Sequence, residues 1–232
     1  MLVLGMIGCA CYMLGDQLWM FLAYGQESEE LGLMLDSRWL DMPYWRFMTS
    51  ILLGAVGTPL YYLGFREMHG IVMEYVKTKA DRRMAKVFQV GYLVGSMCWI
   101  YVHALCMVLS IVLKSVYETC RDLDAAVAVA ERVLSCNLIP YLAAFAAGDG
   151  CLMIAMLALV GRKTLPVGKW ALLCNPVLIP LIIGNLTTML PWPVNQFDHF
   201  SESLGHLAVL AVGMVVIYKE QENRNKKETG SS

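Results

Sequence analysis

The chain has 232 residues, of which 58% are hydrophobic and only 16% are charged, and its formal net charge is −1. Soluble domains contain about 25% charged residues, so the composition excludes an ordinary water-soluble globular protein. A nearly balanced charge also gives no reason to expect nucleic acid as a partner. A helical protein that crosses the membrane several times is therefore expected, with membrane lipids as its surroundings.

Six apolar stretches follow one another along the chain. They cover residues 2–24, 47–65, 88–116, 138–160, 171–190 and 204–218. A transmembrane helix needs about 20 apolar residues, so the sixth stretch is short and the third is long enough to tilt or protrude. The sequence thus predicts an all-α bundle of six transmembrane helices over residues 1–218, followed by a polar cytoplasmic tail that frays over residues 219–232.

The positions of Lys and Arg predict the orientation of this bundle. None precedes Arg38, so the first stretch lacks the basic start of a signal peptide and is expected to remain as a helix. Thirteen of the 18 basic residues follow the second, fourth and sixth stretches. Because cytoplasmic loops carry the excess of Lys and Arg, both termini are expected in the cytoplasm. The outer side is rich in acidic residues, Glu202 among them, which a solvated surface explains.

The connecting segments carry further predictions. Residues 26–46 mix acidic with aromatic residues, as is typical of chain lying at the outer membrane interface. Residues 66–86 place apolar residues at helical spacing among Lys and Arg, which predicts a cytoplasmic interfacial helix. Residues 117–136 favour helix and extend the third span. Cys120 and Cys136 lie in this outer segment, where a disulfide is permitted but not established by the sequence.

Proline and asparagine interrupt the fifth apolar stretch. Asn175 precedes Pro176, and Pro180 and Asn185 follow within the same stretch. Such breaks persist in lipid only where neighbouring helices or water satisfy the freed carbonyl groups. Asn175 and Asn185 therefore favour a kinked fifth helix that faces the bundle interior. Ordinary proline kinks with satisfied Asn side chains explain the pattern equally well.

The two halves of the chain share a sparse pattern. Asp16 in the first stretch corresponds to Asp149 in the fourth, each directly after a glycine, and the third and sixth stretches carry His103 and His206. Proline interrupts both the second and the fifth stretch. Three helices in each half give the halves opposite orientations, which is the 3+3 inverted repeat of many secondary transporters. Chance similarity between apolar helices is the alternative.

Three ionisable side chains lie inside apolar stretches, namely Asp16, His103 and Asp149. A charged group at bilayer depth is costly unless it is paired, hydrated or used. Helices one, three and four are expected to present these groups to one midplane cavity, where they bind a ligand or a proton. A structural hydrogen bond between helices is the alternative, most readily for His103. Asn175 and Asn185 are further candidates for the same site.

No metal and no cofactor are expected. The eight cysteines contain no C-x2-C pair, and six of them lie in apolar stretches, where Cys packs as a small apolar residue. Two Asp and one His suit a divalent ion, but no sequence-local pair such as H-x3-H supports such a site.

Short motifs follow one another along most of the chain. They are Gly15-Asp16, Pro59-Leu60-Tyr61-Tyr62-Leu63-Gly64, His103-Ala104, Leu165-Pro166, Trp170-Ala171-Leu172-Leu173, Asn175-Pro176 and Leu190-Pro191-Trp192-Pro193-Val194-Asn195. In this order they resemble an uncharacterised family of bacterial six-helix membrane proteins, classed as a domain of unknown function. The resemblance implies a bacterial cytoplasmic membrane and six helices, and it carries no known activity. A looser resemblance, by analogy only, is to emopamil-binding-type proteins, whose helical bundles enclose a lipid pocket.

These patterns lead to one expected function and two alternatives. The expected function is to bind, and to transport with proton coupling, a small or amphipathic molecule in the midplane cavity. The first alternative is an intramembrane enzyme that acts on a lipid or isoprenoid, with Asp149 or Asp16 as the acid–base group and His103 as its partner. The second is a structural or assembly subunit whose polar residues hold helices together. The ligand, the coupling ion and the oligomeric state are not specified by the sequence.

Overall fold

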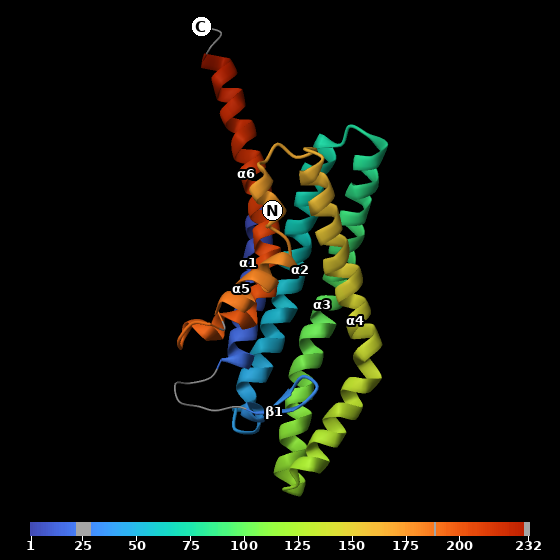
Figure 1. Cartoon of the computed structure of the whole chain (residues 1–232), viewed down its shortest axis with the longest axis vertical. Helices are drawn as coiled ribbons and strands as arrows, with labels where there is room; N and C mark the ends of the chain where they lie inside the picture. Colours follow the sequence, from blue (N-terminus) through green and yellow to red (C-terminus); the bar gives the residue numbers. More distant parts are fainter. Residues whose placement is uncertain (22–28, 188, 230–232) are drawn as a thin grey trace.

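The structure is a computed structural model that describes residues 1–21, 29–187 and 189–229. Within these residues, five long helices form an elongated bundle (Figure 1). They are α1 (Leu2–Met20), α2 (Tyr44–Tyr75), α3 (Lys79–Cys120), α4 (Leu123–Gly161) and α6 (Ser201–Thr229). Each is long and apolar enough to cross a membrane. The chain is therefore a multi-pass helical membrane protein.

Side chains that face outward from the middle of the bundle are apolar. Met97 in α3 is 74% exposed and Ile139 in α4 is 80% exposed. In water such exposure would be costly, whereas in a bilayer these side chains face lipid. The pattern of exposure thus agrees with the lengths of the helices.

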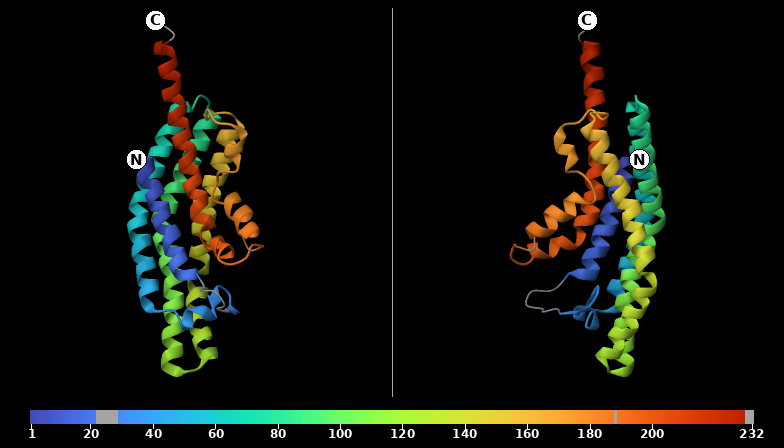
Figure 2. Two further views of the ribbon diagram at one scale, coloured as in Figure 1. Left: turned by 90° about the vertical axis from the view of Figure 1, so that its left-hand side faces the viewer. Right: turned by 45° about the vertical axis from the view of Figure 1, so that its right-hand side comes forward.

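The fifth apolar stretch does not form a long helix. It contains the 3-10 helix η2 (Lys169–Leu172) and the ten-residue helix α5 (Leu178–Thr187), and a second 3-10 helix, η3 (Val194–Phe200), leads into α6. A ten-residue helix spans about 15 Å, which is half of the hydrocarbon thickness. The predicted count of six full-length spanning helices is therefore not confirmed. Figure 2 shows α5 and η3 as an arm that projects from the side of the bundle.

The segment between α2 and α3 differs from the prediction because both helices are longer than their apolar stretches. α2 continues to Tyr75 and α3 already begins at Lys79, so no separate interfacial helix forms over residues 66–86. The start of α3 is fixed by a capping box between Thr78 and Asp81. Arg162 and Thr164 also donate hydrogen bonds to the Asp81 carboxylate, at 3.0 and 3.1 Å, which ties the end of α4 to this turn.

At the opposite end of the bundle, α3 does not continue through residues 117–136. It ends at Cys120, where Arg121 adopts the left-handed conformation with φ of 55°, and α4 begins at Leu123 after an Asp122 cap. Cys120 and Cys136 are both free and exposed, so the disulfide is not present.

A small hairpin closes the bundle beside the end of α1. Strands β1 (Glu30–Gly32) and β2 (Leu35–Asp36) pair antiparallel and lead into the 3-10 helix η1 (Ser37–Leu40). Arg46 donates to the carbonyls of Leu18 and Phe21, which satisfies acceptors that the end of α1 leaves unpaired. The part of the predicted outer segment before residue 29 lies outside the described residues.

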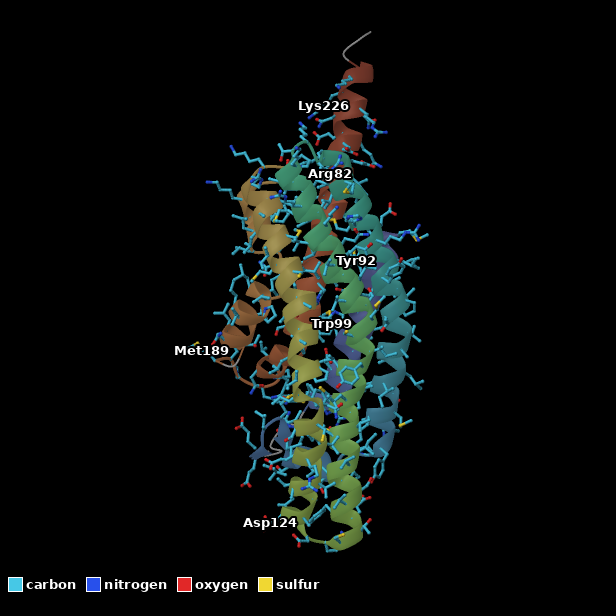
Figure 3. The ribbon with its side chains drawn as sticks, turned by 90° about the vertical axis from the view of Figure 1, so that its right-hand side faces the viewer. Arg82, Tyr92, Trp99, Asp124, Met189 and Lys226 are labelled. Atoms are coloured by element: carbon cyan, nitrogen blue, oxygen red, sulfur yellow. The ribbon has the colours of Figure 1, made fainter. Side chains whose placement is uncertain are left out.

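The basic residues gather at one end of the bundle. α1 and α3 run in one direction and α2, α4 and α6 in the other, so α1 starts in the half that also holds the C-terminus (Figure 1). Arg82 and Lys226 mark this end and Asp124 marks the opposite end (Figure 3). The tail is helical as far as Thr229, because α6 continues beyond the bundle without interruption.

Close approach of α1 and α2 depends on glycine. A Cβ atom on Gly64 would lie 2.4 Å from Gly5 Cα, which no neighbour can relieve by a side-chain rotation. Glycine pairs of this kind allow transmembrane helix backbones to touch. Gly70, in the same helix, has nothing within 4 Å of a Cβ position.

Replacing Gly64 by Ala is therefore expected to lower the free energy of unfolding by about 1–3 kcal/mol, because it overpacks the α1–α2 contact. The matched Gly70→Ala variant is expected to leave it unchanged or to raise it slightly, because Ala favours helix over Gly. Unfolding of both variants in detergent micelles measures the difference. Equal effects at the two positions would contradict the close contact.

Candidate functional site

A cavity of about 180 Å³ lies between α1, α3, α4 and α6, with Tyr61 of α2 in its wall. It extends along α1 from Cys9 to Trp19, which corresponds to about 15 Å of helix. Met34 of the hairpin lines its end nearest the hairpin. Trp99, another lining residue, lies in the interior of the bundle between the ends marked by Arg82 and Asp124 (Figure 3). The volume is sufficient for several waters or a small organic molecule.

The first polar group on this cavity is the pair formed by Asp16 of α1 and His103 of α3. His103 Nδ1 lies 3.3 Å from Asp16 Oδ1. The other ring nitrogen, Nε2, lies 3.0 Å from the backbone oxygen of Ser50, which can only accept a hydrogen bond. Nε2 therefore donates to this oxygen, while Nδ1 faces the aspartate. Asp16 also accepts a hydrogen bond from Ser203 at 3.4 Å.

The contacts of His103 resemble a hydrolytic triad, because its ring lies between Ser50 and Asp16. Ser50 does not fit the role of the nucleophile. Ser50 Oγ lies 2.9 Å from His103 Nε2, yet its own proton is donated to the Gly15 carbonyl at 3.0 Å. Ser50 is fully buried and does not line the cavity. A serine nucleophile must give its proton to the imidazole and reach the substrate, so this group packs α1, α2 and α3 together and does not attack a substrate.

The second polar group is the pair formed by Asp149 of α4 and His206 of α6. His206 Nε2 lies 2.9 Å from Asp149 Oδ1, close but not aligned as a hydrogen bond, and neither atom has another hydrogen-bond partner within the described chain. His206 Nδ1 lies 3.1 Å from the Glu202 carbonyl, to which it donates. The pair repeats the first one, since one ring nitrogen donates to a backbone carbonyl and the other faces an aspartate.

Glu202 supplies a third carboxylate. It lines the cavity one helical turn before His206; its carboxyl group shares a hydrogen bond with that of Asp149 and also interacts electrostatically with Asp16. It forms no salt bridge with Lys or Arg among the described residues. Glu202 therefore stands between the two Asp–His pairs without an imidazole of its own.

The two aspartates lie at nearly the same depth. Asp16 contacts Ser203 and Asp149 contacts His206, and these two contact residues of α6 are three positions apart. Three residues of helix rise about 4.5 Å, which is less than one turn. The two pairs are therefore arranged around one level of the bundle.

Two buried polar atoms in the cavity wall have no well-formed hydrogen bond within the described part of the chain. Tyr61 is 2% exposed and Trp99 is 7% exposed. The indole N–H of Trp99 lies beside the Tyr61 hydroxyl without good hydrogen-bond geometry, and neither group has another partner in the described chain. Buried polar groups are usually hydrogen-bonded. Unpaired donors beside a cavity point to an occupant, water or ligand, that completes them.

The predicted site residues divide into three sets. Asp16 and His103 contact each other on the cavity, whereas Asp149 lies behind His206 and off the cavity surface. Asn175 is fully buried but does not line the cavity. Its side chain caps α5 by accepting hydrogen bonds from the amides of Val177 and Leu178. Asn185 is exposed and donates to the Leu181 carbonyl, so it does not face the bundle interior as predicted.

Sequence reasoning placed Glu202 on the solvated outer surface, which is wrong because α6 begins at Ser201 and not at residue 204. His206 was interpreted as a polar contact between helices, and it does lie against Asp149 of α4. The spacing of Glu202 and His206 contains a signal, because residues four apart share one face of a helix. Nothing in the local sequence predicts that Ser50 and Ser203 contact these groups.

Comparison with known proteins gives a family for this chain. A family described as being of unknown function (DUF6796) matches residues 1–220. The chain belongs to this family. The match confirms the resemblance to an uncharacterised family and includes every residue named above as lining the cavity. No curated protein and no solved structure matches the chain.

The second pair is testable by a double-mutant cycle of Asp149→Asn and His206→Gln. Because the two side chains touch, their coupling energy is expected to be about 0.5–3 kcal/mol, measured by unfolding in micelles. The matched control combines Asp149→Asn with His103→Gln, which belongs to the other pair. Coupling of the same size in both cycles would contradict the assignment of partners.

Proposed function

We propose that this protein binds a small or amphipathic molecule in the cavity and moves it across the membrane, with proton exchange at the two Asp–His pairs. The observation that carries the proposal is the arrangement of both pairs and Glu202 around one level of a cavity that remains open. In each pair an imidazole nitrogen faces a carboxylate oxygen, at 3.3 Å in the first pair and 2.9 Å in the second, and such groups exchange protons readily. Purely structural pairs have no need of an adjacent cavity with unpaired donors.

The proposed architecture is a 3+3 inverted repeat. The pairs support it, because in each half the aspartate of the first helix faces the histidine of the third. α1 and α4 run in opposite directions, as do α3 and α6 (Figure 1). In such a repeat α1 corresponds to α4 and α3 corresponds to α6. A contact between α1 and α6 therefore requires an equivalent contact between α4 and α3, and both contacts are present. Inverted repeats with a midplane site are a common design of secondary transporters.

The proposed orientation has both termini in the cytoplasm of a bacterial cell membrane. The segment from η2 to η3 then acts as a broken fifth crossing between α4 and α6. Discontinuous helices form the substrate and ion sites of many transporters, whereas here the broken segment packs beside α6 and contributes no described residue to the cavity wall. Here Asn175 caps one such end beside α6, where Gly205 allows Pro176 to approach closely.

An intramembrane enzyme acting on a lipid or isoprenoid is the second candidate. The contact of Asp16 with His103 beside the cavity favours it, because a carboxylate that orients an imidazole is a common acid–base arrangement. No serine of the described chain has the arrangement of an activated nucleophile, since Ser203 on the cavity donates to Asp16 and not to the imidazole, and Ser50, which contacts the imidazole, is buried and donates elsewhere. Transport or binding is therefore the stronger conclusion.

Transport predicts that the cavity is reached from both sides of the membrane. In a cysteine-free background, Ser203→Cys is expected to react with a membrane-impermeant thiol reagent added from either side of oriented vesicles. Reaction from one side only would contradict alternating access and favour the enzyme or a receptor.

Two control variants fix the sidedness in the same experiment. Asp124→Cys, on an exposed turn, is expected to react only from outside, and Asn225→Cys, in the exposed end of α6, only from the cytoplasmic side. The reverse pattern would overturn the proposed orientation.

A second prediction concerns the aspartates. Native mass spectrometry and lipid extraction of the purified protein are expected to reveal a bound species that Asp16→Asn or Asp149→Asn loses. A substrate-derived product in its place would favour the enzyme. If both variants keep the same species and differ only in thermal stability, the aspartates are structural and the proposed function fails.

A further inference from the structure

We propose that the ligand of this cavity is a small organic cation, in which an ammonium group is joined to an apolar body. The inference rests on the proposed function, because it names the chemical class that the cavity binds. Three independent features of the cavity carry it: its mainly acidic ionisable groups, the nature of its walls and its unpaired buried donors.

The ionisable groups of the cavity are mainly acidic. Asp16 and Glu202 line it, and Asp149 lies directly behind His206. Among the described residues of the lining, none is Lys or Arg. Three carboxyl groups thus outnumber the two imidazoles, which favours a positive ligand over a neutral or an anionic one. An anionic ligand would face the same carboxylates at close range in a medium of low dielectric.

Glu202 is the carboxylate that such a ligand would meet. Asp16 and Asp149 each face a histidine, whereas Glu202 faces the cavity without a basic partner in the described chain. A ligand ammonium near Glu202 would therefore complete the third ion pair. It would also reduce the repulsion between Glu202 and the two aspartates.

The walls of the cavity are aromatic. They are formed by Tyr12, Trp19, Tyr61, Trp99, Tyr141 and Phe145. Trp99 packs edge-on against Phe145 at 4.8 Å between ring centroids, and Tyr141 lies 5.0 Å from the same ring. Aromatic faces attract organic cations, and the attraction is strongest where water is excluded. They also suit an apolar body, which a bare metal ion lacks.

The unpaired donors distinguish a ligand site from an accidental gap. Tyr61 and Trp99 are more than nine-tenths buried, line the cavity, and hold a hydroxyl and an N–H without well-formed hydrogen bonds in the described chain. A metal ion is not favoured, because the described residues contain no group of three His, Cys, Asp or Glu side chains placed to hold one. An organic ligand with polar and apolar parts fits both the buried donors and the aromatic walls of the cavity.

Three probes of equal shape test the charge preference: benzylammonium, benzyl alcohol and benzoate. Titration calorimetry of the full-length protein in nanodiscs is expected to show about tenfold tighter binding of benzylammonium than of benzyl alcohol, and no binding of benzoate. Equal or tighter binding of the alcohol or of benzoate would overturn the proposal. So would the absence of benzylammonium binding.

Variants locate the site. Glu202→Gln is expected to weaken benzylammonium binding by about tenfold while leaving benzyl alcohol unchanged, since it removes charge and preserves shape. Glu118→Gln, at the exposed end of α3, is the matched control and is expected to change neither. Trp99→Phe, which keeps the aromatic face but removes the indole N–H, gives a second test if Glu202→Gln fails to fold. Unchanged cation binding in the variants that fold, Trp99→Phe included, would place binding elsewhere and overturn the site.

The outcomes also separate this inference from the proposed function. If Ser203→Cys reacts from both sides but benzylammonium shows no preference, the ligand class is wrong and transport stands. If benzylammonium binds as expected but Ser203→Cys reacts from one side only, the cation site stands and transport fails.

Discussion

The pairing of an aspartate with a histidine, made twice in this bundle, is the interaction on which the remaining structure depends. Asp149 and His206 are nearly fully buried at membrane depth, and each would be costly there without the other. The same holds for His103 beside Asp16. Together the two pairs join α1 to α3 and α4 to α6, so they fix the rotation of four helices about their axes. The cavity is bounded by the helices that these pairs orient.

Close helix contacts prepare this arrangement. Gly5 and Gly64 bring α1 and α2 into backbone contact, and Gly91 does the same for α3 against the Gly148 carbonyl of α4. In lipid, where apolar surfaces gain little by meeting, such contacts replace the hydrophobic effect as the source of helix association. They also place Asp149, which follows Gly148, on the face of α4 that turns inward.

The helical membrane fold was predictable from the sequence, because a helix that spans the membrane must have a certain length and a high hydropathy. The spans of α1 to α4 and the inward position of Asp16, His103 and Asp149 follow from the cost of exposing charge to lipid. The fifth segment was not predictable in this way. Its composition suits a full span, but Asn175 caps a helix of only ten residues, and Pro176 packs closely against Gly205 of α6.

The partners within the site depend on tertiary contacts that no local pattern encodes. The predicted repeat would make His103 and His206 corresponding residues, yet which aspartate meets which histidine is decided by the rotation of each helix about its axis. Glu202 was assigned to the surface because hydropathy is averaged over a window of residues. This average places the start of the sixth helix at residue 204, three residues after the true start of α6. The position of Glu202 bears on the choice between a structural and a binding role. Two closed Asp–His pairs satisfy a purely structural role, whereas Glu202 adds a third carboxyl group that faces a cavity with aromatic walls and has no Lys or Arg partner in the described chain. A buried acidic group of that kind is costly at membrane depth, and this cost supports the proposed binding role.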